Sequence, residues 1–382
     1  MRSTGIYVTS TTLGEAVRAF VPHPLPPRKP ALAAESFVEQ NRVAELALAR
    51  LSGVSGLVPS VDWLLYSAIR KEALLTSQIE GTQATLTDLF DDEAGIAVRN
   101  TDDVEEVTNY LRAFRLVQDN LRDPGGLPIS VRLLSDAHAL LLDGARGSGK
   151  QPGALRRSQN WIGGTRPGNA VFVPPPAEHV AGLLGDVEQF IHTSTFADLP
   201  PLVKIALVHA QFETIHPFLD GNGRIGRLLI AALLEHWRLL PEPLMYLSGY
   251  LKQHQAEYYR RLSNIRTEGD WEGWVSFFLE GVVTAAHDAE RGVVAIASLV
   301  TADRRRLLQH PKSGPASYRL FELLPLMPRF TVERVRQKLE TSFPTANAAV
   351  KLLEELGIVN EVTGQRKNRS FSYKAYVALL TR

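Results

Sequence analysis

The fold of this chain is decided by one stretch, His216-Pro217-Phe218-Leu219-Asp220-Gly221-Asn222-Gly223-Arg224-Ile225-Gly226-Arg227. Before it, residues 202–212 are almost continuously apolar and predict a buried helix. A proline disfavours helical geometry at the residue before it, so this helix should end at His216. After the stretch, residues 224–240 are again apolar with helical spacing. The sequence therefore predicts a helix, a loop and a second helix.

The composition of this loop suits a polyanion. Gly221, Asn222 and Gly223 can adopt the unusual backbone angles that aim successive N–H groups into one concavity. The following helix, expected from about Arg224, presents its positive N-terminal end to the same place. Arg224 and Arg227 are three residues apart and share a helical face, where both guanidinium groups can bind phosphate oxygens. These features together predict a phosphate-binding loop.

Two further residues of the stretch are suited to chemistry on a phosphate. Asp220 is a hard oxygen ligand of the kind that Mg²⁺ prefers when phosphates also hold the ion. His216 can take up a proton near neutral pH. The alternative is a helix hairpin with a Gly-rich turn and surface charges, which is disfavoured because all these residues fall within twelve positions.

At these residues the chain resembles the Fic family of AMP-transferring enzymes. The family motif, His-Pro-Phe-x-x-Gly-Asn-Gly-Arg-x-x-Arg, is matched at every fixed position from His216 to Arg227. Relatives with Ala or Lys in place of the loop glycine or first arginine phosphorylate their targets, so Gly221 and Arg224 indicate nucleotidyl transfer. The resemblance implies a mainly α fold, a helical bundle with a β-hairpin flap. It also implies that AMP passes from ATP to a Ser, Thr or Tyr hydroxyl of a target protein, or of the enzyme itself, and that pyrophosphate is released.

A second motif ends the long helix predicted from Val61 to Glu80. On its own, Glu80 is unfavourable there, because a helix C-terminus disfavours negative charge, and a solvated glutamate is the alternative. The resemblance adds the inhibitory pattern Ser/Thr-x-x-x-Glu-Gly/Asn, which Thr76, Glu80 and Gly81 match. It implies that Glu80 pairs with Arg227, occupies the arginine needed for the γ-phosphate, and makes the enzyme autoinhibited.

Residues 156–176 are predicted to form a hairpin. The short β-prone runs 158–162 and 170–173 are separated by Gly and Pro. An ordinary loop hairpin is the alternative to the family's flap, which lies over the active site and pairs with an extended segment of the target. The resemblance implies that Ile162, Gly163 and Gly164 lie nearest the nucleotide.

Aromatic residues of a later helix are a further part of the predicted nucleotide site. In the family a paired Tyr-Tyr lines the adenine pocket, which implies this role for Tyr258 and Tyr259, although core and surface packing explains most tyrosines. His209, in the apolar helix before the motif, is expected to be a hydrogen-bonded core residue.

The overall composition limits the classes of function. The 382 residues carry a formal net charge of +1, so the whole chain is not an electrostatic nucleic-acid binder. The absence of cysteine excludes disulfides and Cys-based zinc sites. The first residues are short of apolar side chains, and no run approaches the roughly 18 apolar residues of a membrane span, so no membrane partner and a cytoplasmic location are expected. Residues 144–150 fit most of a P-loop pattern, but Gln151 replaces the Ser/Thr that binds magnesium, so a surface loop is expected.

The C-terminal residues differ in charge from the rest. Residues 301–382 hold 15 Lys/Arg and 7 Asp/Glu, a balance of +8 against −7 for the remainder. Helices at about 315–326, 332–340 and 345–356, then a basic loop, resemble a winged helix-turn-helix. Arg366, Lys367 and Arg369 are candidates for contacts with DNA phosphates, with residues 345–351 in a groove. A dimerisation or docking module is the equal alternative, and the number of subunits is left open, although dimers are common among such relatives.

Three domains are therefore expected. Residues 1–100 are predicted to hold an N-terminal arm and the inhibitory helix, residues 101–300 the Fic catalytic core, and residues 301–382 the winged helix-turn-helix-like domain. The Pro-rich residues 1–34 resemble the arm that opens many bacterial Fic proteins, with a floppy tail as the alternative. A second function remains open: a DNA-binding transcriptional regulator that uses the Fic core as a nucleotide sensor. Further helices are predicted at 35–51, 102–120, 130–142, 176–193, 245–265 and 271–297.

Overall fold

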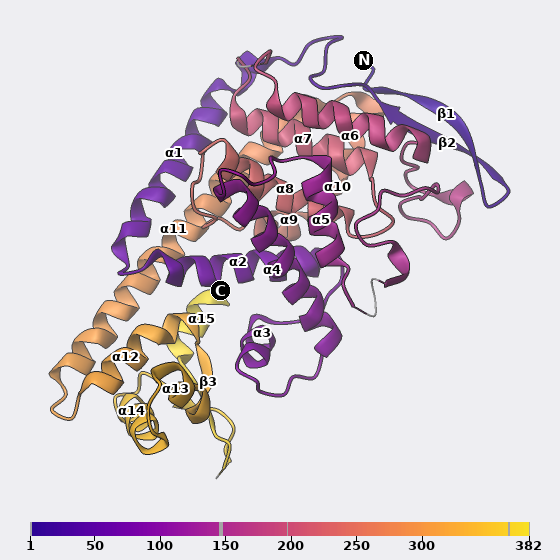
Figure 1. Cartoon of the computed structure of the whole chain (residues 1–382). Helices are drawn as coiled ribbons and strands as arrows, with labels where there is room; N and C mark the ends of the chain where they lie inside the picture. The colour runs from indigo at the N-terminus through magenta and orange to yellow at the C-terminus, as the bar shows by residue number, and fades with distance from the viewer. Residues whose placement is uncertain (1, 145–147, 197, 366, 382) are drawn as a thin grey trace.

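The helix α7 (Pro201–Ile215), buried from Leu202 onward, lies in the core of the computed structural model, which describes residues 2–144, 148–196, 198–365 and 367–381. Every residue from Leu202 to Ile215 is buried, which explains why the sequence shows an apolar run rather than an amphipathic stripe. Helix α8 (Asn222–His236) packs against α7, with the motif loop between them. The fold is mainly α, as predicted (Figure 1).

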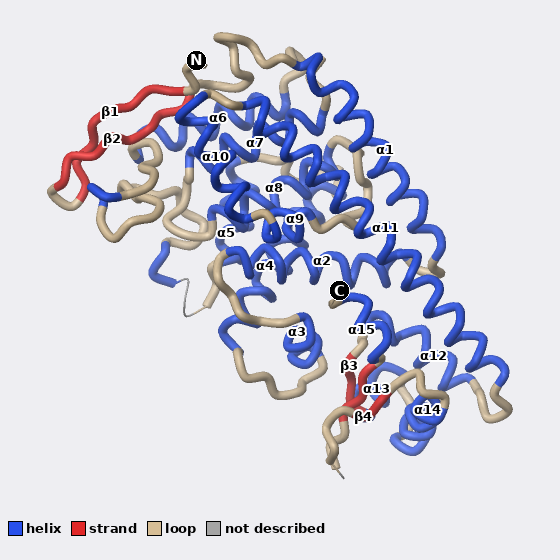
Figure 2. Tube along the Cα trace, turned by 180° about the vertical axis from the view of Figure 1, so that it is seen from behind, coloured by secondary structure: helices blue, strands red, loops and turns tan. Residues whose placement is uncertain are grey.

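The other helices of the bundle surround this pair. Helix α2 contacts α4, α8 and α9, and α5 packs on α4 and α8. Helices α1 and α11 run side by side along one flank, as Figures 1 and 2 both show. Their bounds are α1 (Val38–Val54), α2 (Val61–Ile79), α3 (Leu86–Glu93), α4 (Thr101–Arg122), α5 (Val131–Leu141), α6 (Ala177–His192), α9 (Leu247–Gln253), α10 (Gln255–Glu268) and α11 (Trp271–Gln309). Short 3₁₀ turns are η1 (Ala34–Phe37), η2 (Ser55–Leu57), η3 (Ser148–Lys150), η4 (Pro167–Asn169) and η5 (Leu324–Leu326).

The N-terminal residues form a β-hairpin that the sequence analysis missed. Strands β1 (Gly5–Thr12) and β2 (Glu15–Pro22) pair antiparallel, and the ribbon extends beyond the helices (Figure 1). The Phe20 N–H donates to the Val173 carbonyl at 3.0 Å, so the ribbon lies beside the predicted flap. A small cluster of Val17, Ala19 and Val173 joins the two.

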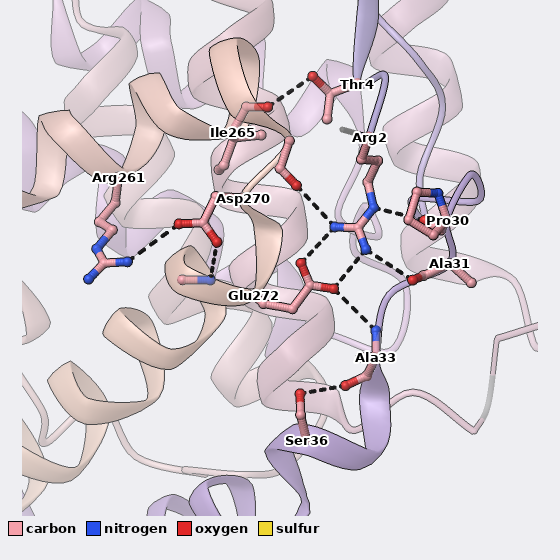
Figure 3. Close-up of polar contacts among 12 residues, drawn as sticks. Arg2, Thr4, Pro30, Ala31, Ala33, Ser36, Arg261, Ile265, Asp270 and Glu272 are labelled. Atoms are coloured by element: carbon pink, nitrogen blue, oxygen red, sulfur yellow. Dashed lines mark hydrogen bonds and ion pairs between the residues drawn. The ribbon is translucent and has the colours of Figure 1, made fainter.

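Arg2 anchors this segment to the helical bundle (Figure 3). Its guanidinium makes two bonds of 2.7 Å to the carboxylate of Glu272 in the first turn of α11. It also donates to the carbonyl oxygens of Pro30, Ala31 and Gly269. These contacts hold the N-terminal residues in place, so the alternative of a floppy tail is wrong.

The C-terminal residues contain the predicted helices and a small sheet. The elements are α12 (Pro315–Leu323), α13 (Val332–Leu339), α14 (Phe343–Glu355) and α15 (Lys374–Leu380). The antiparallel sheet has the order β3 (Arg329–Thr331), β5 (Ser370–Ser372) and β4 (Asn360–Glu361). Arg329 makes bonds of 2.6 and 2.8 Å to Asp91 of α3, and Tyr376 donates to the Trp63 carbonyl of α2 at 3.3 Å. The C-terminal unit therefore packs on α2 and α3.

Two predicted helices have different bounds in the structure. Helix α11 continues to Gln309 rather than ending near residue 297, because Val300, Asp303 and Leu307 extend its buried face. The helix predicted over 245–265 is divided at His254 into α9 and α10, although helical hydrogen bonds continue on both sides of that residue. Among the described residues, no helix is long and apolar enough to cross a bilayer. The P-loop-like stretch includes residues 145–147, which lie outside the described part, as does Arg366.

Candidate active site

The motif loop begins with a sharp change of backbone direction at His216. Helix α7 ends one residue earlier, as the proline predicts, and His216 adopts the left-handed conformation with φ +50°. The Nδ1 atom of His216 is buried and has no hydrogen-bond partner among the described residues. Burial and the charge of Arg156 lower the pKa of His216 to about 4. This imidazole is therefore neutral at pH 7.

Arg156 holds this backbone in place. Its side chain is buried, and it donates to the carbonyl oxygens of His216 at 2.8 Å and Ile215 at 3.3 Å. It also donates to the carbonyl oxygens of Ser158 and Pro175, one on each arm of the predicted flap. One guanidinium therefore ties the base of the flap to the start of the motif loop.

The loop itself is closed by Asn222. Its side-chain oxygen accepts the Phe218 N–H at 2.8 Å, and its amide nitrogen donates to the Phe218 carbonyl at 2.8 Å. Helix α8 therefore starts at Asn222, two residues before the predicted start. The prediction of unusual backbone angles is confirmed for Gly221 (φ +75°) and wrong for Asn222 and Gly223, which are helical. The N–H groups of this first turn remain available, because a helix N-terminus has no internal partners for them.

Asp220 is the residue at this loop that fits a magnesium ion. Its Oδ1 accepts the Gly221 N–H at 2.7 Å and lies 3.8 Å from Nη2 of Arg224. The side chain is 48 % exposed, so the carboxylate has free coordination positions that face solvent. A hard carboxylate beside a helix N-terminus is a suitable donor for Mg²⁺ that is shared with phosphate oxygens. No group of three or more acidic or histidine side chains that could hold a metal occurs in the described part of the chain.

Helix α2 brings Thr76 and Glu80 onto Arg227. The Nε of Arg227 donates to the Thr76 hydroxyl at 2.6 Å, and its Nη2 donates to the Thr76 carbonyl at 3.1 Å and to Glu80 Oε1 at 2.6 Å. A side chain at Gly223 would collide with this carboxylate, so glycine is required for the approach. Gly81, at φ +102°, turns the chain after the helix. The pairing of Glu80 with Arg227 expected from the sequence is present.

Charge and burial act in opposite directions on the carboxylates around Arg227. Burial raises the pKa of Glu80, but the charge and hydrogen bond of Arg227 outweigh it, so the pKa lies below its ordinary value. Burial raises the pKa of Glu213 to about 7, against the attraction of Arg227. Arg227 is therefore neutralised mainly by Glu80, which stays ionised at neutral pH.

The other motif arginine, Arg224, is also buried and faces weaker partners. Its Nη1 lies 3.6 Å from the carboxylate of Glu106 on α4, and its Nε has no hydrogen-bond partner in the described residues. The Thr82 hydroxyl, just after Gly81, donates to the same carboxylate at 2.9 Å. Arg224 therefore retains donors that can bind an incoming anion.

The predicted flap is shorter than a regular hairpin. Its arms share one antiparallel bridge, with Ile162 N–H to Phe172 at 2.8 Å and Phe172 N–H to Ile162 at 3.1 Å. Gly163 and Gly164 both have positive φ, and they begin the turn. The strands do not extend toward the base, because Gln159 and Asn160 donate side-chain bonds to backbone carbonyls and residues 174–176 are prolines without N–H groups.

The two tyrosines predicted at the adenine pocket have different environments. Tyr258 is buried, and its hydroxyl lies 2.9 Å from Nε2 of His209. Because Nδ1 of His209 contacts the Gly226 carbonyl at 3.0 Å, Nδ1 carries the proton and Nε2 accepts from the tyrosine. His209 is thus a hydrogen-bonded core residue, as expected. Tyr259 is 46 % exposed and packs against Tyr258.

Several residues that shape the site were missed from the sequence. They are Arg156, Asn160, Glu213 and His138, whose ring lies behind the motif loop. Each is a single polar residue in a run without a motif, so no local signal separates it from an ordinary surface or core residue. Only the fold brings them to the loop.

Comparison with protein families places two segments of the chain. Residues 38–119 match the model described as Fic/DOC family N-terminal, and residues 128–234 match the Fic/DOC family model. The second segment contains the complete motif His216 to Arg227, and the first contains Thr76 and Glu80.

Two named relatives are similar in sequence to part of this chain. The chain is 27 % identical over 208 residues to Protein adenylyltransferase Fic of Drosophila willistoni, a match that covers 53 % of this chain and 38 % of that protein. The match to the same protein of Drosophila erecta is 32 % identical over 128 residues, and it covers 34 % of this chain and 23 % of the relative. The chain thus spans well under half the length of these curated relatives.

Solved structures share the fold at low sequence identity. A Fic family protein from Desulfovibrio desulfuricans superposes with a TM-score of 0.53 at 21 % identity, covering 86 % of this chain and 95 % of that one. Fic-1 from C. elegans superposes with a TM-score of 0.52 at 20 % identity, covering 69 % of this chain and 74 % of that one. Over residues 38–119 and 128–234 this chain is similar to proteins of the Fic/DOC family.

Proposed function

We propose that this protein is an adenylyltransferase that moves AMP from ATP to a Ser, Thr or Tyr hydroxyl of a target protein, or of itself. The observation that carries the proposal is the arrangement of one neutral imidazole, two buried arginines and a helix N-terminus around the loop from His216 to Arg227. The curated relatives named protein adenylyltransferase support the reaction class.

The roles of the site residues follow from their chemistry. The phosphates of ATP bind at Gly221 and at the first turn of α8, which begins with Asn222 and Gly223. The β-phosphate then lies near Arg224 and the γ-phosphate near Arg227. Asp220 holds Mg²⁺, whose charge offsets that of the phosphate oxygens. Catalysis then depends on positioning and on charge stabilisation.

The transfer step requires a base beside the acceptor hydroxyl. The target oxygen bonds to the α-phosphorus, the bond to the bridging β-phosphate oxygen breaks, and pyrophosphate leaves. The hydroxyl proton goes to His216, whose imidazole is neutral at pH 7. The target segment pairs with the flap at Ile162 and Gly163, so that main-chain bonds set its register.

The adenine and the inhibitory contact complete the proposal. The base of the nucleotide stacks on the aromatic pair, chiefly on the exposed ring of Tyr259, which covers the buried Tyr258. Glu80 and Thr76 hold Arg227 away from the γ-phosphate, so the resting enzyme is autoinhibited.

A labelling experiment tests the proposed reaction. Protein carrying Glu80→Gly is incubated with a protein extract and ATP labelled in either the α- or the γ-phosphate. Label from the α-phosphate alone should enter protein, and His216→Ala in the same background should reduce it by about 10²–10⁴-fold. Incorporation of γ-label would point to phosphoryl transfer, and undiminished α-label with His216→Ala would contradict the role of the histidine.

The second candidate function is a DNA-binding regulator with a nucleotide-sensing core. The observation in its favour is the +8 charge of residues 301–382 together with exposed Lys367 and half-buried Arg369, which line one pocket with Asn347 of α14. Contact with DNA phosphates would retard DNA in an electrophoretic mobility shift assay, and this binding would weaken steeply as the salt concentration rises. A sequence-specific, salt-dependent DNA shift with no AMP transfer by the Glu80→Gly variant would favour this function over the first.

A further inference from the structure

We infer that His138 is a positioning residue that fixes the Asp220 carboxylate from behind the motif loop; the inference rests on the proposed function. His138 comes from α5 and is completely buried. Its ring stacks on Phe218, with centroids 3.8 Å apart and planes 10° from parallel. It therefore packs directly against the motif loop.

Two hydrogen bonds define the tautomer of His138. The Gly153 N–H donates to Nδ1 at 2.9 Å, so Nδ1 carries no proton. The Nε2 atom lies 3.0 Å from the Asp220 carbonyl oxygen, which can only accept, so Nε2 carries the proton. The ring thus connects the chain just before the flap to the motif loop.

The Asp220–Gly221 peptide transmits this contact to the carboxylate. The carbonyl oxygen of this peptide belongs to Asp220 and accepts the hydrogen bond from His138. The N–H of the same peptide belongs to Gly221 and donates to Oδ1 of Asp220 at 2.7 Å. A peptide is planar, so fixing the C=O fixes the direction of the N–H and hence the position of Oδ1. The other carboxylate oxygen is left for Mg²⁺.

The space around Gly221 is consistent with this role. Gly221 has φ +75°, and a Cβ built there would lie 3.1 Å from Leu141 and 3.5 Å from the His138 ring. The α5 surface is thus packed closely against the turn. Residues that orient a metal ligand through a hydrogen bond typically change metal affinity by 10–100-fold when replaced.

The test uses His138→Phe and His138→Gln in the Glu80→Gly background. Phe keeps the stack on Phe218 and removes both hydrogen bonds, whereas a Gln amide can reach the position of Nε2. Calorimetry of ATP binding is measured with and without Mg²⁺. The expected result is that His138→Phe raises the Mg²⁺ concentration needed for half-maximal binding by about tenfold or more, and that His138→Gln restores part of it.

A matched control separates positioning from general packing. His192 also places Nε2 against a backbone carbonyl, that of Ile129, at the end of α6 and away from the loop. His192→Phe should leave the magnesium dependence unchanged. Equal magnesium dependence in the parent and in His138→Phe would overturn the inference.

A second measurement does not depend on nucleotide or folding of the variants. Nitrogen NMR of the unliganded protein should show His138 protonated at Nε2 and unprotonated at Nδ1, and the opposite tautomer would overturn the inference. If the parent binds no ATP in Mg²⁺, the proposed function fails, and the tautomer still decides whether His138 holds the loop as described.

Discussion

Replacing Glu80 is expected to accelerate AMP transfer by a factor that the structure limits. Arg227 is held by three groups of α2, and Glu80→Gly removes one of them, the charged contact of 2.6 Å. A hydrogen bond between charged groups contributes about 1.5–3 kcal/mol. The Glu80 side chain is 37 % exposed, so solvent screening lowers this to about 1–2 kcal/mol.

This free energy converts directly into a rate. If Arg227 must leave α2 before it can bind the γ-phosphate, a loss of about 1–2 kcal/mol corresponds to about 5- to 30-fold faster transfer. Glu80→Gln keeps the shape and an acceptor oxygen but not the charge, so its transfer rate should fall between those of wild type and Glu80→Gly. The assay is the initial rate of protein labelling from α-labelled ATP at saturating nucleotide.

The control and the contradicting result are well defined. Glu355→Gln, on the exposed face of α14, removes a charge far from Arg227 and should leave the rate unchanged. Wild-type rates in both Glu80 variants, with ATP binding intact by calorimetry, would refute the view that this contact limits the reaction.

Four further outcomes follow from the same geometry. The pKa of His216 is lowered to about 4, so the histidine stays neutral as pH falls from 8 to 6. The transfer rate of the Glu80→Gly variant should therefore not drop through protonation of this residue in that range. A sigmoidal loss of rate with a midpoint near pH 6.5, abolished by His216→Ala, would contradict this. Burial raises the pKa of Glu213 to about 7, so ionisation of this carboxyl lowers the stability of the folded protein as pH rises. The Tm of Glu213→Gln minus that of wild type should therefore increase from pH 5 to pH 8. A Tm difference that stays constant over this range would contradict the prediction. Gly226→Ala places a Cβ 2.5 Å from Oε1 of Glu213 and should lower the free energy of unfolding by about 1–3 kcal/mol in urea denaturation. No loss would show that the Glu213 side chain can move aside without cost. The bidentate pair of Arg329 and Asp91 should give a coupling energy of about 1–2 kcal/mol in a double-mutant cycle of alanine variants, and additive effects would mean that the two side chains do not interact in solution.

The main helices and the motif loop could be predicted because their signals are local. The apolar run before His216 and the proline after it set the end of α7. The contact of Glu80 with Arg227 was also predicted, but only from the resemblance. These two residues are 147 positions apart, and nothing in either segment alone points to the other.

The parts that could not be predicted depend on long-range packing. The Asn222 side chain closes the loop by bonding Phe218, and this moves the helix start into a stretch that reads as a turn. Arg156 and His138 contact the loop through backbone carbonyls, for which sequence carries no pattern. The N-terminal hairpin was hidden because prolines after residue 21 dominated the composition of the segment.

The position of the C-terminal unit on α2 has a mechanical consequence. Tyr376 bonds the carbonyl of Trp63 near the start of this helix, and Glu80 contacts Arg227 at its other end. A rise of 1.5 Å per residue makes these points about 25 Å apart, so α2 is a rigid rod that joins them. A tilt of about 5° at one end moves the other by about 2 Å, which is enough to break a contact of 2.6 Å. A displacement of the C-terminal unit that tilts α2 would therefore be transmitted to the guanidinium of Arg227.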